Sequence, residues 1–269
     1  MSTKAGTKAR SKSAKKAAKE NTAIYVYGVV PADVEVQKNA KGVGDPPAAV
    51  DVIRDGDIAA LVSTVPIDNP LGRPEDLQAH ARLLDGTAGV APVLPLQFGA
   101  VMTDSESVAE ELLRGHHDEF ANALESLEGH AEYIIKGRYD EQEFLSQLLS
   151  ESKEAQQLRD DIQNTPKEAS RNSQMALGEL IANVIEQQRQ AHTRAVVEEL
   201  DGVAEQMNPR EPTHEWDAVQ LALLAQVERQ ADLEEILERL NDEWQGLVTL
   251  RLLGPLAPYD FVVTAQPGG

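Results

Sequence analysis

Between positions 247 and 252, near the end of the chain, apolar residues alternate with Thr249 and Arg251. This period of two is typical of a β-strand with one buried face. We expect the strand to end at the glycine and proline of positions 254 and 255, because proline has no N–H for a neighbouring strand. A turn that contains Tyr259 and Phe261 follows. The pattern therefore predicts a half-buried terminal strand that leads into a stiff aromatic turn.

The first half of the chain has the pattern of a sheet covered by helices. Its first strand is apolar on both faces, which is typical of a central strand. Asp55-Gly56 favours a tight hairpin, and Thr103 and Glu106 have the spacing of a capping box. We expect strands at residues 23–30, 50–54 and 58–65, a helix at 75–88, an edge strand or extended crossing at 92–101, and a helix from Thr103 to Gly129.

The second half combines strands with long helices. We expect a short strand at residues 131–139, two helices of an antiparallel hairpin that Pro166 separates, a strand at 217–227, a helix at 231–244 and the terminal strand. A helix would also suit residues 217–227. This order is close to a split βαβ, ferredoxin-like sheet with an enlarged first crossover. The fold class is α+β, with two α/β domains at residues 23–128 and 129–269 after a basic tail at 1–22.

Charge is unevenly distributed along the chain. Residues 1–20 contain seven Lys and Arg and one acidic residue, whereas the remaining 249 residues contain 18 basic and 44 acidic ones. A body this acidic repels phosphate backbones, so we expect no nucleic-acid partner. The tail lacks aromatic residues and is expected to be disordered. It is either a solvated solubility tail or a segment that binds an acidic surface.

The sequence indicates a cytoplasmic protein without a membrane span. No stretch approaches the roughly 18 apolar residues that a transmembrane helix needs, and the N-terminus lacks the apolar core of a signal peptide. The chain has no cysteine, which excludes disulfides, thiolate metal sites and a cysteine nucleophile.

The common catalytic motifs are missing from the sequence. There is no phosphate-binding loop, dinucleotide fingerprint or His-Glu-x-x-His motif. His116 and His117 are adjacent and would point about 100° apart on a helix, which is a poor geometry for chelation. His80 lies on the apolar stripe of its helix, so we expect it to face the sheet and bond a backbone carbonyl. We therefore expect no catalytic residue, no metal and no cofactor.

Three segments together resemble the gas vesicle protein F/L (GvpF/GvpL) family. They are YVYGVV at residues 25–30, PVLPLQFGAV at 92–101 and LLGPLAPYDFV at 252–262. IAALVS at 58–63 and His80 lie between the first two, and GHAEYIIK at 129–136 falls where the family's second domain begins. The likeness covers about residues 23–263. Ala257 is a departure, because many members have a second proline there.

The resemblance implies an accessory or minor structural protein of gas vesicles, the gas-filled shells that give microbes buoyancy. Members have two α/β domains, the second a modified ferredoxin-like fold with added helices, and are not known as enzymes. They are understood to bind the small hydrophobic shell protein and other accessory proteins during assembly. As partner-binding residues we select Tyr259 and Phe261, then Phe98, although all three would also suit a core. The alternatives are a ferredoxin-like regulatory module that binds a small molecule and a metal-dependent enzyme that uses His116 and His117.

Overall fold

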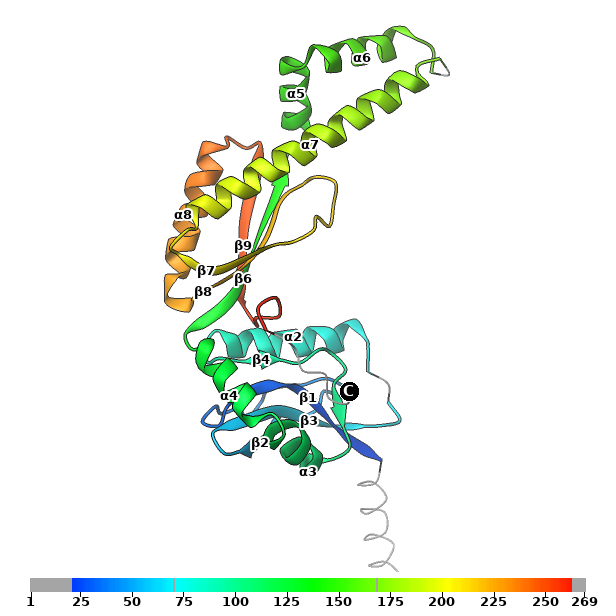
Figure 1. Ribbon diagram of the computed structural model, residues 1–269. Helices are drawn as coiled ribbons and strands as arrows, with labels where there is room; N and C mark the ends of the chain where they lie inside the picture. Colours follow the sequence, from blue (N-terminus) through cyan, green and yellow to red (C-terminus); the bar gives the residue numbers. More distant parts are fainter. Residues whose placement is uncertain (1–20, 70, 168, 263–269) are drawn as a thin grey trace, which may run out of the picture. The chain divides into compact units, whose positions relative to one another are not determined.

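The computed structural model describes residues 21–69, 71–167 and 169–262 (Figure 1). The tail expected at residues 1–22 therefore lies almost entirely outside the described residues. The chain forms two compact units, of which one comprises residues up to Ala131 together with the segment that begins at Pro255. The other is Glu132–Gly254. The sequence suggests a single boundary near residue 128, whereas the chain returns to its first unit at the end.

The sheet of the first unit is built around β1 (Thr22–Pro31), as the apolar pattern predicts. Its strands have the order β2-β3-β1-β4, and β5 also pairs with β1. All of these pairs are antiparallel. The hairpin at Asp55-Gly56 is confirmed. The other strands are β2 (Asp51–Asp55), β3 (Ile58–Pro66), β4 (Leu94–Pro95) and β5 (Val101–Met102).

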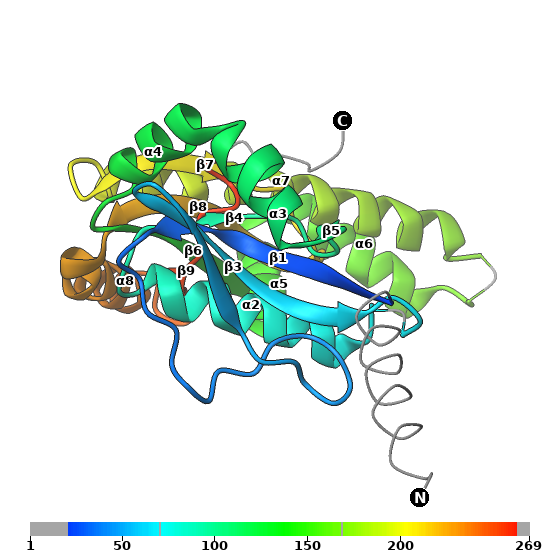
Figure 2. The ribbon, with the colours of Figure 1, turned by 90° about the horizontal axis from the view of Figure 1, so that it is seen from below.

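Helices cover both faces of this sheet, which explains why β1 is buried along most of its length. α2 (Pro74–Ala88) lies on one face, and the helices that follow β5 lie on the other (Figure 2). These are α3 (Ser105–Ser107), the π-helical turn η1 (Val108–Arg114) and α4 (His117–Ser126). The sequence predicted one continuous helix here. The π-helical turn takes more residues per turn than an α-helix, and it keeps Val108, Leu112 and Leu113 buried.

The predicted capping box at Thr103 and Glu106 is wrong by one residue. Asp104 is the N-cap residue, and its carboxylate accepts a hydrogen bond from the N–H of Ser107 at 2.8 Å. The Thr103 hydroxyl instead lies 2.8 Å from the Ser107 hydroxyl. Thr103 and Asp104 are both residue types that favour the N-cap position, so the spacing in the sequence does not show which of them caps the helix.

The second unit contains a four-stranded sheet in the order β7-β8-β6-β9. Its strands are β6 (His130–Tyr139), β7 (Ala204–Pro209), β8 (Asp217–Gln226) and β9 (Val248–Leu256). The sequence predicted only three strands, and β7 was assigned to a helix end and a loop. β7 is an exposed, polar edge strand without apolar alternation. β9 also continues through positions 254 and 255 instead of ending there.

The helices of the second unit include the expected helical hairpin. They are α5 (Glu141–Glu151), α6 (Lys153–Asn164), α7 (Arg171–Glu199), the short η2 (Val227–Arg229) and α8 (Gln230–Glu243). The first predicted helix of the hairpin is two helices, because Ser152 ends α5 and its hydroxyl accepts the N–H of Ala155 to begin α6. Among the described residues, none of the helices combines the length and the hydrophobicity of a membrane span.

A side chain forms hydrogen bonds with the backbone at the outer edge of β9. The Asn241 side-chain amide of α8 donates to the Leu250 carbonyl at 3.2 Å and accepts the Leu250 N–H at 2.7 Å. Asn241 thus occupies the hydrogen-bonding groups that another strand would use. This limits edge-to-edge pairing with other chains.

Candidate functional site

A buried histidine joins distant parts of the first unit. His80 lies on the stripe of α2 that faces the sheet and is only 3% exposed, as expected from its position. Its Nδ1 lies 2.8 Å from the Tyr25 hydroxyl, and its Nε2 lies 2.8 Å from the Tyr259 hydroxyl. His80 therefore connects β1, α2 and the turn that follows β9.

One direction of hydrogen bonding satisfies this chain of groups. The Gly99 N–H donates to the Tyr25 hydroxyl at 3.2 Å, so the Tyr25 O–H is left to donate to Nδ1 of His80. The Nε2–H of His80 then donates to the Tyr259 hydroxyl, which in turn faces the Leu96 carbonyl at 3.5 Å. This assigns the neutral Nε2–H tautomer from the network. Tyrosine hydroxyls thus bond both ring nitrogens, in addition to the backbone carbonyl of Leu96, which also acts on the ring.

His80 is neutral at physiological pH. Burial lowers its pKa to about 4, and the opposing effect of the Leu96 carbonyl is smaller. Burial also raises the pKa of Tyr25, against the smaller effect of the Gly99 N–H. At neutral pH Tyr25 and His80 are thus both uncharged. They form a positioning network for Tyr259.

The aromatic residues predicted to bind a partner all lie in this unit. The Phe98 ring is 5.9 Å from the Tyr25 ring and 5.7 Å from the His80 ring, measured between centroids. Tyr259 is 37% exposed, whereas Phe98 and Phe261 are half-buried. Phe98 and Tyr259 thus meet at His80, and Phe261 follows in the same turn, where its N–H donates to Pro258. We name Phe98, Tyr259 and Phe261 the aromatic cluster.

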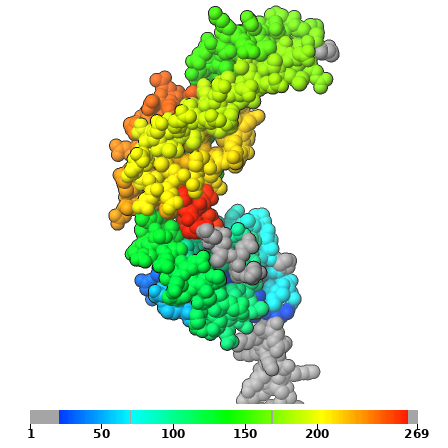
Figure 3. All heavy atoms as spheres, in the orientation of Figure 1, coloured from blue at the N-terminus to red at the C-terminus, as the bar shows by residue number. Residues whose placement is uncertain are grey.

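The turn that bears Tyr259 is also fastened to α2 by its backbone. The N–H of Ala257 donates to a carboxylate oxygen of Asp85 at 3.1 Å, and Ala257 is buried. Proline at this position would have no N–H to donate. The hydrogen bond to Asp85 therefore depends on Ala257, the residue at which this chain departs from the family pattern. Figure 3 shows atoms of this last segment, in red, at the molecular surface.

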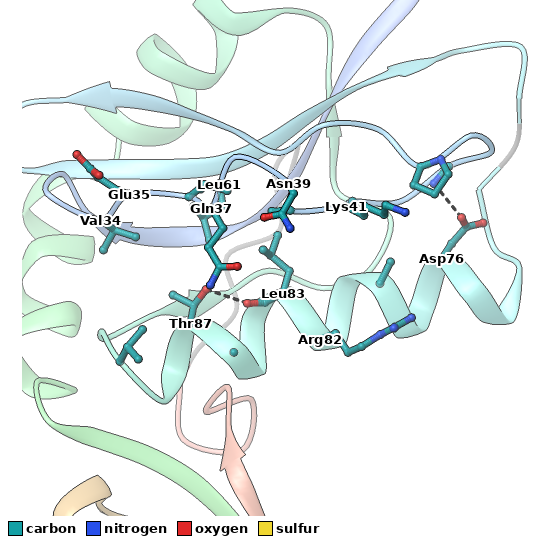
Figure 4. Close-up of a pocket in the computed structure, with 18 of the residues that line it drawn as sticks. Val34, Glu35, Gln37, Asn39, Lys41, Leu61, Asp76, Arg82, Leu83 and Thr87 are labelled. Atoms are coloured by element: carbon teal, nitrogen blue, oxygen red, sulfur yellow. Dashed lines mark hydrogen bonds between the residues drawn. The ribbon is translucent and has the colours of Figure 1, made fainter.

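The other flank of α2 lines an apolar groove. A cavity of about 520 Å³ lies between α2 and the loop of residues 34–47 (Figure 4). Val34, Leu61, Ala79 and Leu83 contribute apolar walls, and the Leu83 side chain projects into the space below the loop. Gln37, Asn39, Lys41 and Arg82 supply polar groups around these walls. No pattern in the sequence predicts this groove, because its loop has no periodic arrangement of apolar residues.

Asp76 holds one end of the groove together. Its carboxylate accepts hydrogen bonds from the N–H groups of Gly44, Gly72 and Arg73 at 2.9, 3.2 and 3.1 Å, and it pairs with the Arg73 guanidinium at 3.3 Å. Burial raises the pKa of this carboxyl, but the bonds from Arg73 and the three N–H groups outweigh it and lower the pKa to about 2.

Asp76→Asn is expected to destabilise the first unit by about 2–4 kcal/mol, because it removes the charge that pairs with Arg73 and replaces an acceptor oxygen by a donor. Asp45→Asn is the matched control. Asp45 pairs with the same guanidinium at 2.9 Å but is mostly exposed, so its loss is expected to cost less than about 1 kcal/mol. Hydrogen exchange of β1 and β3 measures both. Equal protection in the two variants would show that Asp76 does not organise the groove.

The histidines that were considered for a metal site have other partners. Nε2 of His117 lies 2.6 Å from Asp57, and Nδ1 of His116 lies 3.3 Å from Glu119. Hydrogen bonds that the protonated His117 ring donates to the carboxylates of Asp118 and Asp57 raise the pKa of His117. Among the residues that the structure describes, no group of three or more His, Asp or Glu side chains is placed to hold a metal ion.

Comparison with known proteins identifies the family. The model of the family "Gas vesicle synthesis protein GvpL/GvpF" matches residues 23–263. Gas vesicle protein F of Streptomyces sp. (strain CB03234) is 29% identical over 240 residues, which are 88% of this chain and 98% of that protein. Gas vesicle protein L of the same organism is 34% identical over 125 residues, or 42% of this chain and 46% of that protein.

Solved structures show the same fold. The crystal structure of GvpF from Anabaena sp. PCC7120 matches with a TM-score of 0.73 at 21% identity and covers 91% of this chain and 99% of its own. GvpF from Microcystis aeruginosa matches with a TM-score of 0.69 at 23% identity and covers 89% of this chain and 98% of its own. The α+β class is therefore confirmed. Because the family model spans nearly the whole described chain, this protein belongs to the gas vesicle protein GvpL/GvpF family.

Proposed function

We propose that this protein binds the small hydrophobic shell protein of gas vesicles, and other accessory gas vesicle proteins, during vesicle assembly. The observation that carries the proposal is the Tyr259 ring, which is partly exposed and held by a hydrogen bond to buried His80. An aromatic side chain held in place binds at a low cost in conformational entropy. Membership of a gas vesicle family supplies the class of partner.

The chemistry of the surface suits an apolar partner. Phe98, whose ring packs against His80, and Phe261, two positions after Tyr259, are both partly exposed. The groove on the other flank of α2 adds a concave apolar surface. A hydrophobic shell subunit exposes apolar surface before it assembles and needs such cover to remain dispersed. The net charge of −20 keeps the complex dispersed in water. The role is binding, and we assign no reaction to it.

The aromatic cluster can be tested by co-expression with the shell protein and pull-down. Tyr259→Ala and Phe261→Ala are each expected to weaken binding by about tenfold or more, as is typical for truncation of an aromatic anchor. Tyr259→Phe keeps the ring but loses the hydrogen bond to His80 that positions it, so it is expected to weaken binding, though less than Tyr259→Ala does.

Ile67→Ala is the matched control, because Ile67 is 60% exposed in the same unit and lies outside the cluster. It is expected to bind like the parent protein. The proposal fails if neither the shell protein nor another vesicle protein associates with the parent. If the alanine variants retain folding and full binding, the aromatic cluster is not the contact. Loss of folding in these variants, with binding intact in Phe98→Leu and Tyr259→Phe, would assign the aromatics to the core.

A small-molecule-binding regulatory module is the second candidate, and the groove favours it. Its volume of about 520 Å³ falls within the usual range for small-ligand pockets, and the polar groups of Gln37 and Asn39 could orient a ligand. A thermal shift with a metabolite panel that is abolished by Gly86→Leu, which fills the groove from α2, would support this reading. An unchanged transition across the panel would remove it.

A further inference from the structure

One face of the sheet in the second unit is turned away from its helices. The Tyr139 hydroxyl of β6 lies 3.0 Å from Nδ1 of His192 in α7, so the odd-numbered positions of β6 face the helices. A Cβ at Gly137 would contact the side chains of Val219 and Leu250, which places these neighbours on the same helical side. The even-numbered positions of β6 and the odd-numbered positions of β9 therefore share the opposite face.

The register of β6 and β9 fixes which residues lie side by side on that face. The N–H of Asp140 donates to the Leu247 carbonyl at 3.0 Å, and Gly137 is next to Leu250. An antiparallel pair with this register places Lys136 directly opposite Arg251 and Ile134 directly opposite Leu253. A Cβ at Gly254 would meet the Tyr133 ring, as the same register requires. We call Ile134, Lys136, Arg138, Thr249, Arg251 and Leu253 the basic face.

The basic face has an unusual charge for this protein. Lys136, Arg138 and Arg251 are exposed, Leu253 is 41% exposed, and the one carboxylate on the same side of β6, Glu132, is only 3% exposed. Within the described ranges, Lys136 and Arg251 form no ion pair, and the Arg138 guanidinium meets only the His214 ring, at 3.5 Å. Outside the tail, the chain contains 44 acidic and 18 basic residues. A cluster of three cations thus stands out from an acidic protein.

The cross-strand pair of Lys136 and Arg251 lowers stability. Like charges directly opposite each other on an antiparallel sheet repel and are destabilising. Opposite charges at these two positions would keep the face soluble and would also increase the stability of the sheet. The adjacent apolar pair of Ile134 and Leu253 adds a surface that water does not favour. Both costs are removed when an anionic, partly apolar group covers the face.

We propose that the basic face binds an acidic segment of a protein partner. Along β6, Ile134, Lys136 and Arg138 are spaced by two residues, or roughly 6.8 Å per step. An extended segment with an apolar side chain and two carboxylates at alternate positions has the same spacing. The carboxylates pair with Lys136, Arg251 and Arg138, and the apolar side chain covers Ile134 and Leu253.

Nucleic acid fits this surface less well than an acidic protein segment. The face carries no aromatic side chain on which a base could stack, and the net charge of −20 repels a polyanion at longer range. A short acidic segment places its charges only at the three cations. Because Tyr259 lies in the other unit, either binding activity can be lost without the other.

The test uses the full chain labelled with ¹⁵N and the synthetic peptide SLSESES, with SLSQSQS as the uncharged control. The acidic peptide is expected to shift the amide signals of β6 and β9, and SLSQSQS is expected to leave them in place. The shifts are expected to weaken at least fivefold when salt is raised from about 50 to 300 mM. Equal shifts with both peptides would overturn the proposal.

Charge reversal separates binding from folding. Lys136→Glu is expected to weaken peptide binding at least tenfold and to raise the urea midpoint, because the new carboxylate would pair with Arg251 across the strands. Lys153→Glu at the start of α6 is the matched control, because it makes the same charge change at an exposed position of the same unit. Unchanged binding in Lys136→Glu overturns the proposal.

Two further arms test other occupants. A single-stranded oligo(U) that shifts the same signals more strongly than SLSESES would overturn the assignment to an acidic protein. Sedimentation of the parent protein as a dimer that Lys136→Glu dissociates would do so too, because a second copy would then occupy the face. A monomer with no oligo(U) shifts supports the proposal.

Discussion

Gly254→Ala is expected to destabilise the second unit by about 2–5 kcal/mol. Gly254 has a φ of 148°, a conformation that costs a residue with a side chain about 1–3 kcal/mol. Its added Cβ would lie 2.4 Å from the ring of Tyr133, which is fully buried. Overpacking of this kind typically costs a further 1–3 kcal/mol. Trp216 and Trp244 are the two tryptophans of the chain and lie in the same unit, so tryptophan fluorescence during urea unfolding measures the loss.

Gly178→Ala is the matched control for this substitution. Gly178 lies on the exposed side of α7, and nothing lies within 4 Å of its added Cβ. Alanine is expected to leave stability unchanged or to raise it by up to about 1 kcal/mol, because it favours the helix. A Gly254→Ala midpoint equal to that of Gly178→Ala would contradict the steric account. Tyr133→Leu should restore part of the loss if the ring is the obstacle.

Acidification from pH 6.5 to pH 4 is expected to remove about 3 kcal/mol of stability from the first unit. The pKa of His80 is about 4 in the folded protein, and an unfolded histidine has a pKa of about 6.5. Between these values the unfolded state binds a proton that the folded state does not, so stability falls as the pH decreases. The contribution is fully present above pH 6.5. At pH 5 the expected loss is already about 2 kcal/mol.

The control for the pH effect is His80→Gln, which cannot titrate. The variant is expected to be less stable at pH 7 but to lose less stability on acidification. Urea unfolding followed by the NMR signals of β1 at pH 7 and pH 5 compares the two proteins. Burial also lowers the pKa of His192, but that residue lies in the other unit and is unchanged in the variant. Parallel pH profiles would contradict the assignment to His80.

The periodic parts of the fold could be predicted from the sequence. β1 and β8 are buried over most of their length, and α8 buries Leu233, Leu237 and Leu240 on one side. The spacing of apolar residues in the sequence therefore predicts which side chains of these elements are buried. β7 could not be predicted this way, because an exposed edge strand needs no apolar face. The break at Ser152 was also missed, since the apolar stripe continues across it.

The candidate site could be predicted only in part. Tyr259 and Phe261 were selected because they lie beside prolines on a stiff turn, and Phe98 was the second choice. The structure brings Tyr259 and Phe98 to His80. The sequence did not indicate that Tyr259 bonds His80, because 179 positions separate them. Nothing local shows that the turn after β9 returns to the first unit. Their pairing depends on the path of the whole chain.

The return of the chain at Pro255 has a consequence for biosynthesis. A ribosome completes β1, α2 and His80 early, but Tyr259 emerges only after all of Glu132–Gly254 has been translated. Units of a nascent chain generally fold in the order in which they are made, so the continuous second unit can fold before the first one is complete. An unfinished chain has no Tyr259 turn for His80 to hold. The aromatic cluster thus exists only on finished molecules, and truncated products would not compete for its partner.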